Sequence, residues 1–306
     1  MSNKTDVLNN DLASLQFTLP FRTEEGNKGS FGRCVVVGGS ANFVGAPRFA
    51  AESAAEVLAL LGEAAMRAGA GTTVLAVPDF LAQALYPVVR YSAVFPLPSK
   101  DGGIMFDRAS ADELARKATS FAIGMGMGGG DAESWVRFLL KETDVKFVLD
   151  ADGLKCAGNI GGFLGRAVLT PHVGEFCAMT GMTAEEVGAD TAEICRAFAA
   201  EHDCVLIIKG HESYISDGRE VYVNRTGNSR LSKGGSGDVL AGIIGGLLAW
   251  DVPALLAART GAYALGRSAE FSRVNALAHL PDDIMSCLPL VFDESVSYTH
   301  LRAHET

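Results

Sequence analysis

A glycine-rich stretch in the carboxyl-terminal half combines residue types that can bind an anion and carry out chemistry beside it. In "NSRLSKGGSGDVLAG" (residues 228–242), Gly235 and Gly237 precede an apolar segment typical of a helix, and Asp238 lies where that helix begins. Glycines let backbone N–H groups approach an anion, and a helix directs its positive end to the same place. Because that field favours a carboxylate, we expect Asp238 to be ionised and to accept a proton from a hydroxyl attacking a phosphoryl group. The simpler alternative is an ordinary helix start with an acidic first turn.

A second glycine-rich stretch, "FAIGMGMGGGDAES", has glycines at 124, 126 and 129 in the spacing G-x-G-x-x-G. A strand pattern precedes it, a helix pattern follows, and Asp150 ends the next strand pattern, which is the context of a dinucleotide-binding fingerprint. A simple glycine turn at a strand end is the alternative. The loop around Gly235 is not a phosphate-binding Walker A loop, because the chain contains no G-x-x-x-x-G-K-[ST] and Lys233 precedes the glycines.

Polar residues also follow two other apolar runs. "VLTPHVGEF" places His172 and Glu175 just beyond a strand pattern, and "CVLIIKG" ends in Lys209 and Gly210. Open α/β sheets bind ligands at the carboxyl ends of their strands, and a lysine there can contact a phosphate. An exposed histidine near a helix start and a solvated strand-end lysine are the alternatives.

Short apolar runs alternate with longer segments rich in Ala and Leu. Runs of four to seven apolar residues predict strands buried on both faces of a parallel sheet. The predicted strands are "RCVVVGGS", "TTVLAVP", "SFAIG", "KFVLDAD", "RAVLTP" and "CVLIIKG". The predicted helices include "PRFAAESAAEVLALLGEAAMRAGAG", "DAESWVRFLL", "TAEICRAFAAEH", "DVLAGIIGGLLAW" and "PALLAARTGAYALGRSAEFSRV". "ESYISDGREVYVN" predicts a hairpin. This order predicts a three-layer α/β/α domain with a mostly parallel central sheet.

Composition excludes some classes of function. The chain has 306 residues and a net charge of −10, which argues against a nucleic-acid or anionic-membrane surface. Its six cysteines are scattered, and its amino-terminal residues lack an apolar signal sequence, so we expect reduced thiols in a cytoplasmic protein. The polar end "SVSYTHLRAHET" shows no periodic pattern. We therefore expect one domain over residues 1–290 and a disordered tail or sequence scar over residues 291–306.

Seven stretches together resemble the ADP/ATP-dependent (S)-NAD(P)H-hydrate dehydratases of the ribokinase-like superfamily. They occur in the family's order over about residues 28–289, and the longest block is the most specific. The stretches are "KGSFGRCVVVGGSANFVGAPRFAAESA", "AIGMGMG", "VLDADGL", "LTPHVGEF", "LIIKGHESYIS", "VYVNRTGNSRLSKGGSGDVLAGIIGGLLA" and "LPDDIMSCLP".

The resemblance implies a ribokinase-like fold and a nucleotide-dependent hydro-lyase that repairs nicotinamide cofactors. The substrate would be the (6S)-hydrate of NADH or NADPH (NADHX or NADPHX). Phosphorylation of its C6 hydroxyl by ADP, or by ATP, and elimination of phosphate would regenerate NAD(P)H. Bacterial members typically use ADP, so we favour ADP as the donor.

The resemblance also assigns roles to individual residues. Asp238 would be the catalytic base, and the backbone at Gly235 and Gly237 would stabilise the transferring phosphoryl group. The residues implied in substrate binding are Ala46, Gly124, Gly126, His172 and Asp238. Those implied in nucleotide binding are Lys209, Gly210, His211, Glu212, Ser213, Asn228 and Gly237.

Further family properties are implied, and the chain also departs from the family's pattern. Mg²⁺ would bridge the phosphates, although the sequence does not identify its ligands. The protein would be a homotetramer and would work with a separate NAD(P)H-hydrate epimerase. Family members usually read G-P-G-L-G where this chain has Gly124 to Gly128, and small residues usually stand where it has His211 and Glu212. Two alternatives are another ribokinase-like kinase that phosphorylates a vitamin-precursor alcohol, and an α/β nucleotide-binding or regulatory subunit that is not an enzyme.

Overall fold

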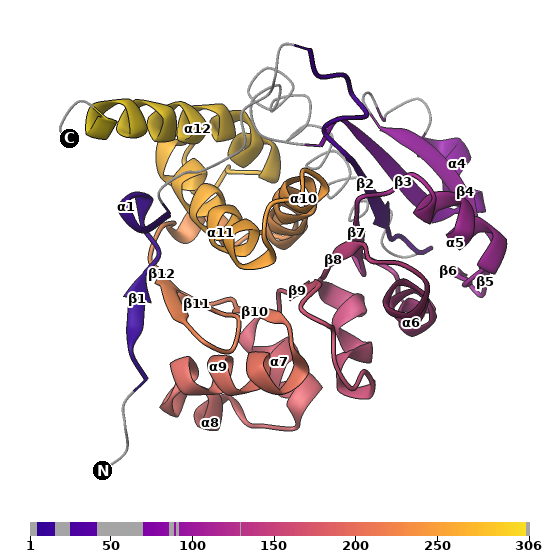
Figure 1. The fold of residues 1–306 in the computed structure, drawn as a ribbon, viewed down its shortest axis with the longest axis horizontal. Coiled ribbons are helices and arrows are strands. Elements are labelled where there is room, and N and C mark those ends of the chain that lie inside the picture. Colours follow the sequence, from indigo (N-terminus) through magenta and orange to yellow (C-terminus); the bar gives the residue numbers. More distant parts are fainter. Residues whose placement is uncertain are drawn as a thin grey trace.

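The computed structural model describes residues 5–15, 25–41, 70–85, 89, 92–128 and 130–303 (Figure 1). Its strands are β1 (Val7–Asn9), β2 (Arg33–Val37), β3 (Thr72–Pro78), β4 (Ala93–Leu97), β5 (Ser99–Lys100), β6 (Gly103–Ile104), β7 (Ser120–Ile123), β8 (Lys146–Leu149), β9 (Ala167–Leu169), β10 (Val205–Ile208), β11 (Ser213–Ser216) and β12 (Val221–Asn224). Its α-helices are α1 (Leu12–Leu15), α4 (Asp79–Leu85), α5 (Arg108–Ala115), α6 (Ala132–Glu142), α7 (Val173–Thr180), α8 (Ala184–Ala189), α9 (Thr191–His202), α10 (Ser236–Ala249), α11 (Ala254–Phe271) and α12 (Pro281–Ala303). Two 3₁₀-helices, η1 (Ala151–Asn159) and η2 (Ser229–Leu231), complete the described elements.

The main sheet confirms the prediction of a mostly parallel arrangement. Its strand order is β1-β12-β11-β10-β9-β8-β7-β2-β3-β4, and β11 is antiparallel to both of its neighbours while the other pairs are parallel. The six apolar runs predicted as strands form β2, β3, β7, β8, β9 and β10. β11 and β12 form the predicted hairpin, and Gly218 at its turn has a φ of 90°.

The apolar runs form central strands because both faces of the sheet are covered. Along β2, Cys34 and Val36 pack into one hydrophobic cluster, whereas Val35 and Val37 pack into the other. Helices α10, α11 and α12 contribute to the first cluster, and α5, α6, α7 and α9 contribute to the second. Figure 1 shows these two groups of helices on opposite sides of the strands. The predicted three-layer architecture is confirmed.

The carboxyl-terminal helix reaches further than the sequence predicted. α12 runs through Ala303 and so enters residues 291–306, the segment predicted to be a disordered tail. Val291 and Phe292 are buried, and Glu294 forms an ion pair with Arg267 of α11 at 2.6 Å. Apolar packing and an ion pair thus extend past residue 290 as far as Glu294, and the assignment of residues 291–306 as a tail or sequence scar stays a prediction.

Some sequence predictions lie outside the described residues. Most of the helix predicted in "PRFAAESAAEVLALLGEAAMRAGAG" belongs to this part, as do Ala46 and Gly129. In the part of the chain that is described, no helix is both long enough and apolar enough to cross a membrane. All six cysteines are free thiols, and four of them are buried.

Candidate functional site

Neighbouring parallel strands bring the predicted polar residues to one edge of the sheet. Gly124 directly follows β7, Asp150 follows β8, and Lys209 follows β10. His172 lies three residues after β9, and its backbone pairs with Lys209 in an isolated parallel bridge. Residues scattered over 85 positions of sequence therefore meet because parallel strands end at the same edge.

A buried ion pair stands at the centre of this edge. Lys209 Nζ lies 2.8 Å from Asp150 Oδ1 and 3.8 Å from Glu175 Oε2. Thr170 donates a hydrogen bond of 2.8 Å to the same oxygen of Asp150, whose side chain is only 5% exposed. Burial lowers the pKa of Lys209, but the negative charges of Asp150, Glu175 and Asp238 outweigh it and raise that pKa above its ordinary value. Lys209 is therefore a fixed positive charge.

The amino terminus of α10 meets this ion pair. Gly235 is its N-cap residue and adopts φ = 95°, a conformation that favours glycine. A Cβ added to Gly237 would lie 3.3 Å from Asp150 Oδ2 and 3.4 Å from Lys209 Nζ. The absence of a side chain at Gly237 thus leaves the first turn of the helix open beside a lysine ammonium group. An anion placed there would meet both the helix terminus and a positive charge.

Asp238 is half-buried in the same turn, and its electrostatic setting differs from the prediction. Burial is the largest effect, and together with the negative charge of Asp150 it raises the pKa of Asp238 to about 7, although Lys209 acts in the opposite direction. The prediction that the field of the helix terminus keeps Asp238 ionised is therefore met only in part, because a carboxyl group with a pKa of about 7 is partly protonated at neutral pH. The field of the helix is outweighed by desolvation and by a second carboxylate. A pKa near neutrality suits a group that must accept and release a proton.

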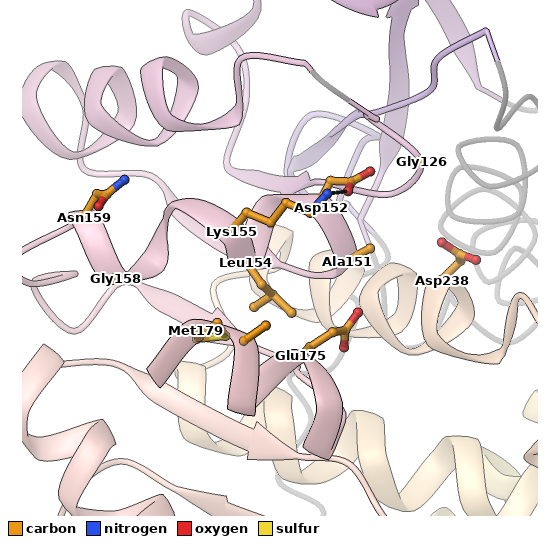
Figure 2. Close-up of a pocket in the computed structure, with 11 residues that line it drawn as sticks. Gly126, Ala151, Asp152, Leu154, Lys155, Gly158, Asn159, Glu175, Met179 and Asp238 are labelled. Atoms are coloured by element: carbon orange, nitrogen blue, oxygen red, sulfur yellow. Dashed lines mark ion pairs between the residues drawn. The ribbon is translucent and has the colours of Figure 1, made fainter. Parts of the chain in front are cut away.

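Two cavities, each of about 700 Å³, adjoin this turn. Cavity 1 lies between the β7 loop, η1 and α7, and Figure 2 shows Asp238 facing it across from Asp152 and Glu175. Lys155 of η1 also lines it and forms an ion pair of 2.5 Å with Asp152. Three carboxylates and one ammonium group thus give cavity 1 an acidic lining among the described residues.

Cavity 2 lies on the other side of the α10 amino terminus, against the hairpin β11–β12 and α11. Its polar lining includes Lys209, His211, Ser213, Asn228, Lys233 and Gly237. None of the described residues that line it carries a carboxylate. Gly237 lines cavity 2 while the next residue, Asp238, lines cavity 1. The first turn of α10 therefore separates a basic cavity from an acidic one.

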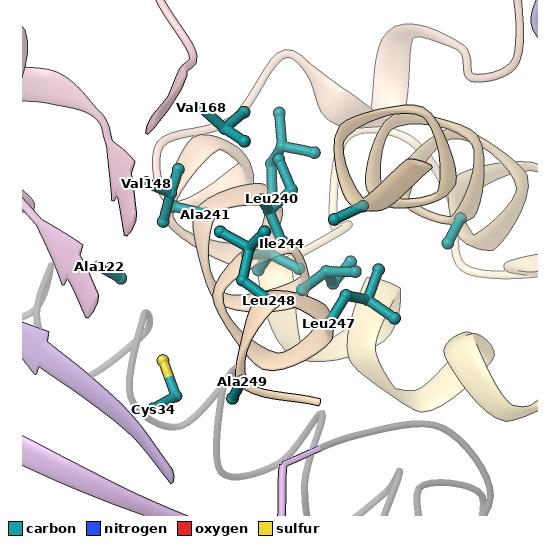
Figure 3. Close-up of a cluster of buried hydrophobic side chains, with 14 of the residues drawn as sticks. Cys34, Ala122, Val148, Val168, Leu240, Ala241, Ile244, Leu247, Leu248 and Ala249 are labelled. Carbon is teal, nitrogen blue, oxygen red and sulfur yellow. The ribbon is translucent and has the colours of Figure 1, made fainter. Parts of the chain in front are cut away.

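Apolar packing fixes the position of α10. Figure 3 shows Leu240, Ala241 and Ile244 of this helix packed beside residues of the central strands, including Val148 and Val168. Ser120 at the start of β7 donates a hydrogen bond of 2.7 Å to the backbone carbonyl of Gly245. These contacts hold α10 against the sheet, so the position of its first turn relative to the ion pair is set by the core.

The structure brings most of the predicted site residues together. Of those predicted to bind the nucleotide, cavity 2 is lined by Lys209, Gly210, His211, Ser213, Asn228 and Gly237. Glu212 is absent from that lining and instead pairs with Arg225, with 2.7 Å between Oε1 and Nε. Gly235 lines neither cavity.

The predicted substrate residues divide between several places. Gly126 and Asp238 line cavity 1, but His172 lines cavity 2. The ring of His172 caps α7, because its Nδ1 accepts a hydrogen bond from the backbone N–H of Glu175. Gly124 packs against the backbone of Asp150. A Cβ at this position would lie 2.0 Å from the Asp150 carbonyl oxygen, so the close approach requires glycine. Ala46 lies outside the described residues.

Sequence reasoning missed the partnership of Asp150 with Lys209 and the roles of Lys155 and Lys233 in lining the cavities. The signal for the first was present, since Asp150 and Lys209 each directly follow at least three consecutive buried strand residues. The sequence signal for Lys155 and Lys233 was weak, because a lysine in a loop or a short helix is usually solvated.

The arrangement can transfer a phosphoryl group between two bound molecules. Cavity 2 offers positive charge for a phosphate donor, and cavity 1 offers a carboxylate for the acceptor. The open turn at Gly237 and the carboxyl group of Asp238 lie where the two cavities adjoin. In-line attack needs donor, acceptor and base close together, and a carboxyl group between two adjoining cavities is compatible with that requirement.

Comparison with known proteins agrees with this geometry. A family model described as NAD(P)H-hydrate dehydratase matches residues 34–290. The chain is 34% identical over 285 residues to the bifunctional NAD(P)H-hydrate repair enzyme of Moorella thermoacetica, which covers 89% of the chain but only 51% of that relative. The chain thus spans about half the length of this curated relative.

Two other relatives are matched over a larger share of their own length than the Moorella thermoacetica enzyme is. The chain is 34% identical over 221 residues to the ADP-dependent (S)-NAD(P)H-hydrate dehydratase of Neisseria meningitidis serogroup B, covering 69% of the chain and 67% of that protein. The crystal structure of the ADP/ATP-dependent NAD(P)H-hydrate dehydratase from Bacillus subtilis, co-crystallized with ATP and Mg²⁺, superimposes with a TM-score of 0.76. That pair is 26% identical and covers 95% of this chain and 99% of the other.

Proposed function

Because this chain belongs to the NAD(P)H-hydrate dehydratase family, we propose that it is an ADP-dependent (S)-NAD(P)H-hydrate dehydratase. It would convert the (6S)-hydrate of NADH or NADPH back to the dihydronicotinamide, using ADP or ATP as phosphoryl donor. One observation carries the proposal: consecutive residues of one helical turn, Gly237 and Asp238, line two cavities of opposite charge. The donor would occupy cavity 2, and the hydrate would occupy cavity 1.

The proposed reaction proceeds in two steps. Asp238 takes the proton of the C6 hydroxyl, and the hydroxyl oxygen attacks the terminal phosphorus of the nucleotide, whose bond to the bridging oxygen breaks. ADP thereby leaves as AMP. The C6–O bond then breaks, phosphate leaves with the electron pair, and the adjacent ring carbon loses a proton. The sum is hydrate plus ADP giving NAD(P)H, AMP and phosphate.

The residues around the α10 amino terminus support the first step. Lys209 is fixed by Asp150 at 2.8 Å, so it presents a constant positive charge on the cavity 2 side. The backbone N–H groups of the first turn stabilise negative charge that develops on the transferring phosphoryl oxygens. The raised pKa of Asp238 makes it a stronger base than an ordinary aspartate once it is ionised.

Magnesium fits this site as an ion bound mainly by the nucleotide. No group of three or more His, Cys, Asp or Glu side chains among the described residues could hold a metal ion. Mg²⁺ commonly combines one or two carboxylates with water and substrate phosphates, and Asp150 Oδ2 faces the α10 turn where the phosphates would lie. When bound, Mg²⁺ would neutralise charge on the phosphates, and Asp150 would be its protein ligand.

The remaining properties belong to the same proposal. We expect a homotetramer in the cytoplasm that works together with an NAD(P)H-hydrate epimerase. The fusion of both activities in bifunctional relatives, such as that of Moorella thermoacetica, supports this pairing.

The test follows the absorbance of the reduced nicotinamide after hydrate, Mg²⁺ and nucleotide are added to purified protein. Recovery of absorbance with NADHX or NADPHX, equal in amount to the AMP and phosphate formed from ADP, is expected. Repeating the assay with ATP and with each hydrate separately identifies the preferred pair. No recovery with either donor would reject the proposal, and phosphorylation of a vitamin-precursor alcohol instead would establish the alternative.

A further inference from the structure

The two lysines that line cavity 2 differ in how far their charge is already compensated. Lys209 is 22% exposed and lies within 4 Å of two carboxylates, Asp150 at 2.8 Å and Glu175 at 3.8 Å. Its positive charge is therefore balanced before any ligand binds. A nucleoside diphosphate brings about three negative charges into the cavity, so a second positive side chain there would strengthen its binding in addition to any bound Mg²⁺.

Lys233 has a neutral partner instead. Its Nζ donates a hydrogen bond of 3.0 Å to the backbone carbonyl oxygen of Leu277, in the segment that joins α11 to α12. Lys233 is exposed and lies in the loop that precedes α10, and both Lys233 and Gly237 of the first helical turn line cavity 2. A phosphate oxygen binds an ammonium group more strongly than a neutral carbonyl does.

We propose that Lys233 exchanges the Leu277 carbonyl for the terminal phosphate of the nucleotide, and so contacts the phosphoryl group that is transferred. This inference rests on the proposed function, because it takes a nucleoside diphosphate or triphosphate as the occupant of cavity 2. The terminal phosphate is the one that must reach the α10 turn, where Gly237 and the base Asp238 lie. Lys233 would thus bind this phosphate while Lys209 remains paired with Asp150.

The alternative role for Lys233 is purely structural, as a tie between the glycine-rich loop and the α11–α12 segment. Arg230 makes the same kind of tie, since its Nε donates a hydrogen bond of 2.8 Å to the Val274 carbonyl oxygen. Arg230 does not line cavity 2. It is therefore a matched control: both residues hold the same segment through a backbone carbonyl, but only Lys233 can reach the nucleotide.

The experiment measures the affinity of ADP and of AMP by calorimetry for the wild-type chain and for Lys233→Met, Lys233→Arg and Arg230→Met. Losing a charged contact to the terminal phosphate should weaken ADP binding by Lys233→Met about tenfold or more. AMP binding should change less than about twofold, because AMP lacks that phosphate. Lys233→Arg should recover part of the ADP affinity, and Arg230→Met should keep the wild-type ratio of the two affinities.

Three outcomes would overturn the inference. An unchanged preference for ADP over AMP in Lys233→Met would show that Lys233 does not touch the terminal phosphate. An equal loss in Arg230→Met would assign both residues a structural role. Absence of ADP and ATP binding to the wild-type chain would reject the inference together with the proposed function, whereas an active wild type with either of the first two outcomes rejects the inference alone.

Discussion

Cavities 1 and 2 have similar volumes but opposite charge. Asp152, Glu175 and Asp238 face cavity 1 against the ammonium group of Lys155. Lys209 and Lys233 line cavity 2, with no carboxylate among its described lining residues. The basic lining of cavity 2 therefore suits the terminal phosphates of a donor better than the acidic lining beside Asp238 does. This difference supports the proposed placement of the phosphoryl donor in cavity 2 and of the hydroxyl acceptor in cavity 1.

Asp150 is a buried carboxylate that acts on charged groups of both cavities. Asp150 lies between the two cavities, where it pairs with Lys209 and raises the pKa of Asp238. Asp150 thus holds the ammonium group of Lys209 beside cavity 2 and contributes to the raised pKa of Asp238 in cavity 1. The two cavities are electrostatically coupled through this side chain.

The substitution Asp238→Asn should have the largest effect on activity, and it tests whether the two cavities have different roles. Removing the base should lower kcat by about 100- to 10,000-fold, because general-base catalysis contributes that much. ADP affinity, measured by calorimetry, should change little, since Asp238 lines cavity 1 rather than cavity 2. As a control, Asp152→Asn removes a carboxylate from the same cavity without touching the α10 turn, and should act mainly on KM. A variant Asp238→Asn with nearly full kcat would break the assignment of the base.

The buried ion pair between the cavities gives the next largest effect. Lys209→Met leaves Asp150 almost fully buried without its cation, which should lower the free energy of unfolding by about 3 kcal/mol and weaken ADP binding. Urea denaturation measures the first and calorimetry the second. The double variant Asp150→Asn, Lys209→Met should regain part of the stability. Lys146→Met is the matched control, because its partner Asp251 is 94% exposed and such a pair contributes about 0–1 kcal/mol.

The coupling through Asp150 predicts a shift in the pH profile. With the pKa of Asp238 raised to about 7, kcat/KM should increase as the pH rises through 7, because only the ionised carboxylate accepts the proton. Asp150→Asn removes a negative charge that raises this pKa, so the rising limb should move about one pH unit lower. Asp251→Asn removes an equal charge at the far end of α10 and should leave the limb in place. A limb that stays in place in Asp150→Asn would show that the cavities are not coupled.

The fold could be predicted from the sequence where local patterns carry it. Strands such as β2 and β10 are apolar on both faces, and that pattern is readable without knowing the neighbours. The end of α12 was not predictable in this way, because Pro289 and the polar residues after it are typical of a helix that has ended. The helix continues past Pro289, where Phe292 is buried against the domain. For the site, the glycine loops and strand-end residues singled out in the sequence lie together at one edge of the sheet. The raised pKa of Asp238 could not be predicted from the sequence, because it depends on burial and on Asp150, which lies 88 residues earlier in sequence and meets it only in the fold.

The smallest expected effect concerns Glu212, which the family resemblance assigns to the nucleotide. Its side chain is 38% exposed and pairs with Arg225, which is 55% exposed, so Glu212→Gln should change stability by less than about 1 kcal/mol. Because Glu212 does not line cavity 2 whereas His211 does, Glu212→Gln should keep ADP affinity within about twofold, and His211→Ala should weaken it more. Calorimetry on both variants decides the matter. A loss in Glu212→Gln as large as that in His211→Ala would mean that a carboxylate contacts the donor, and the charge contrast between the cavities would then be weaker than the structure indicates.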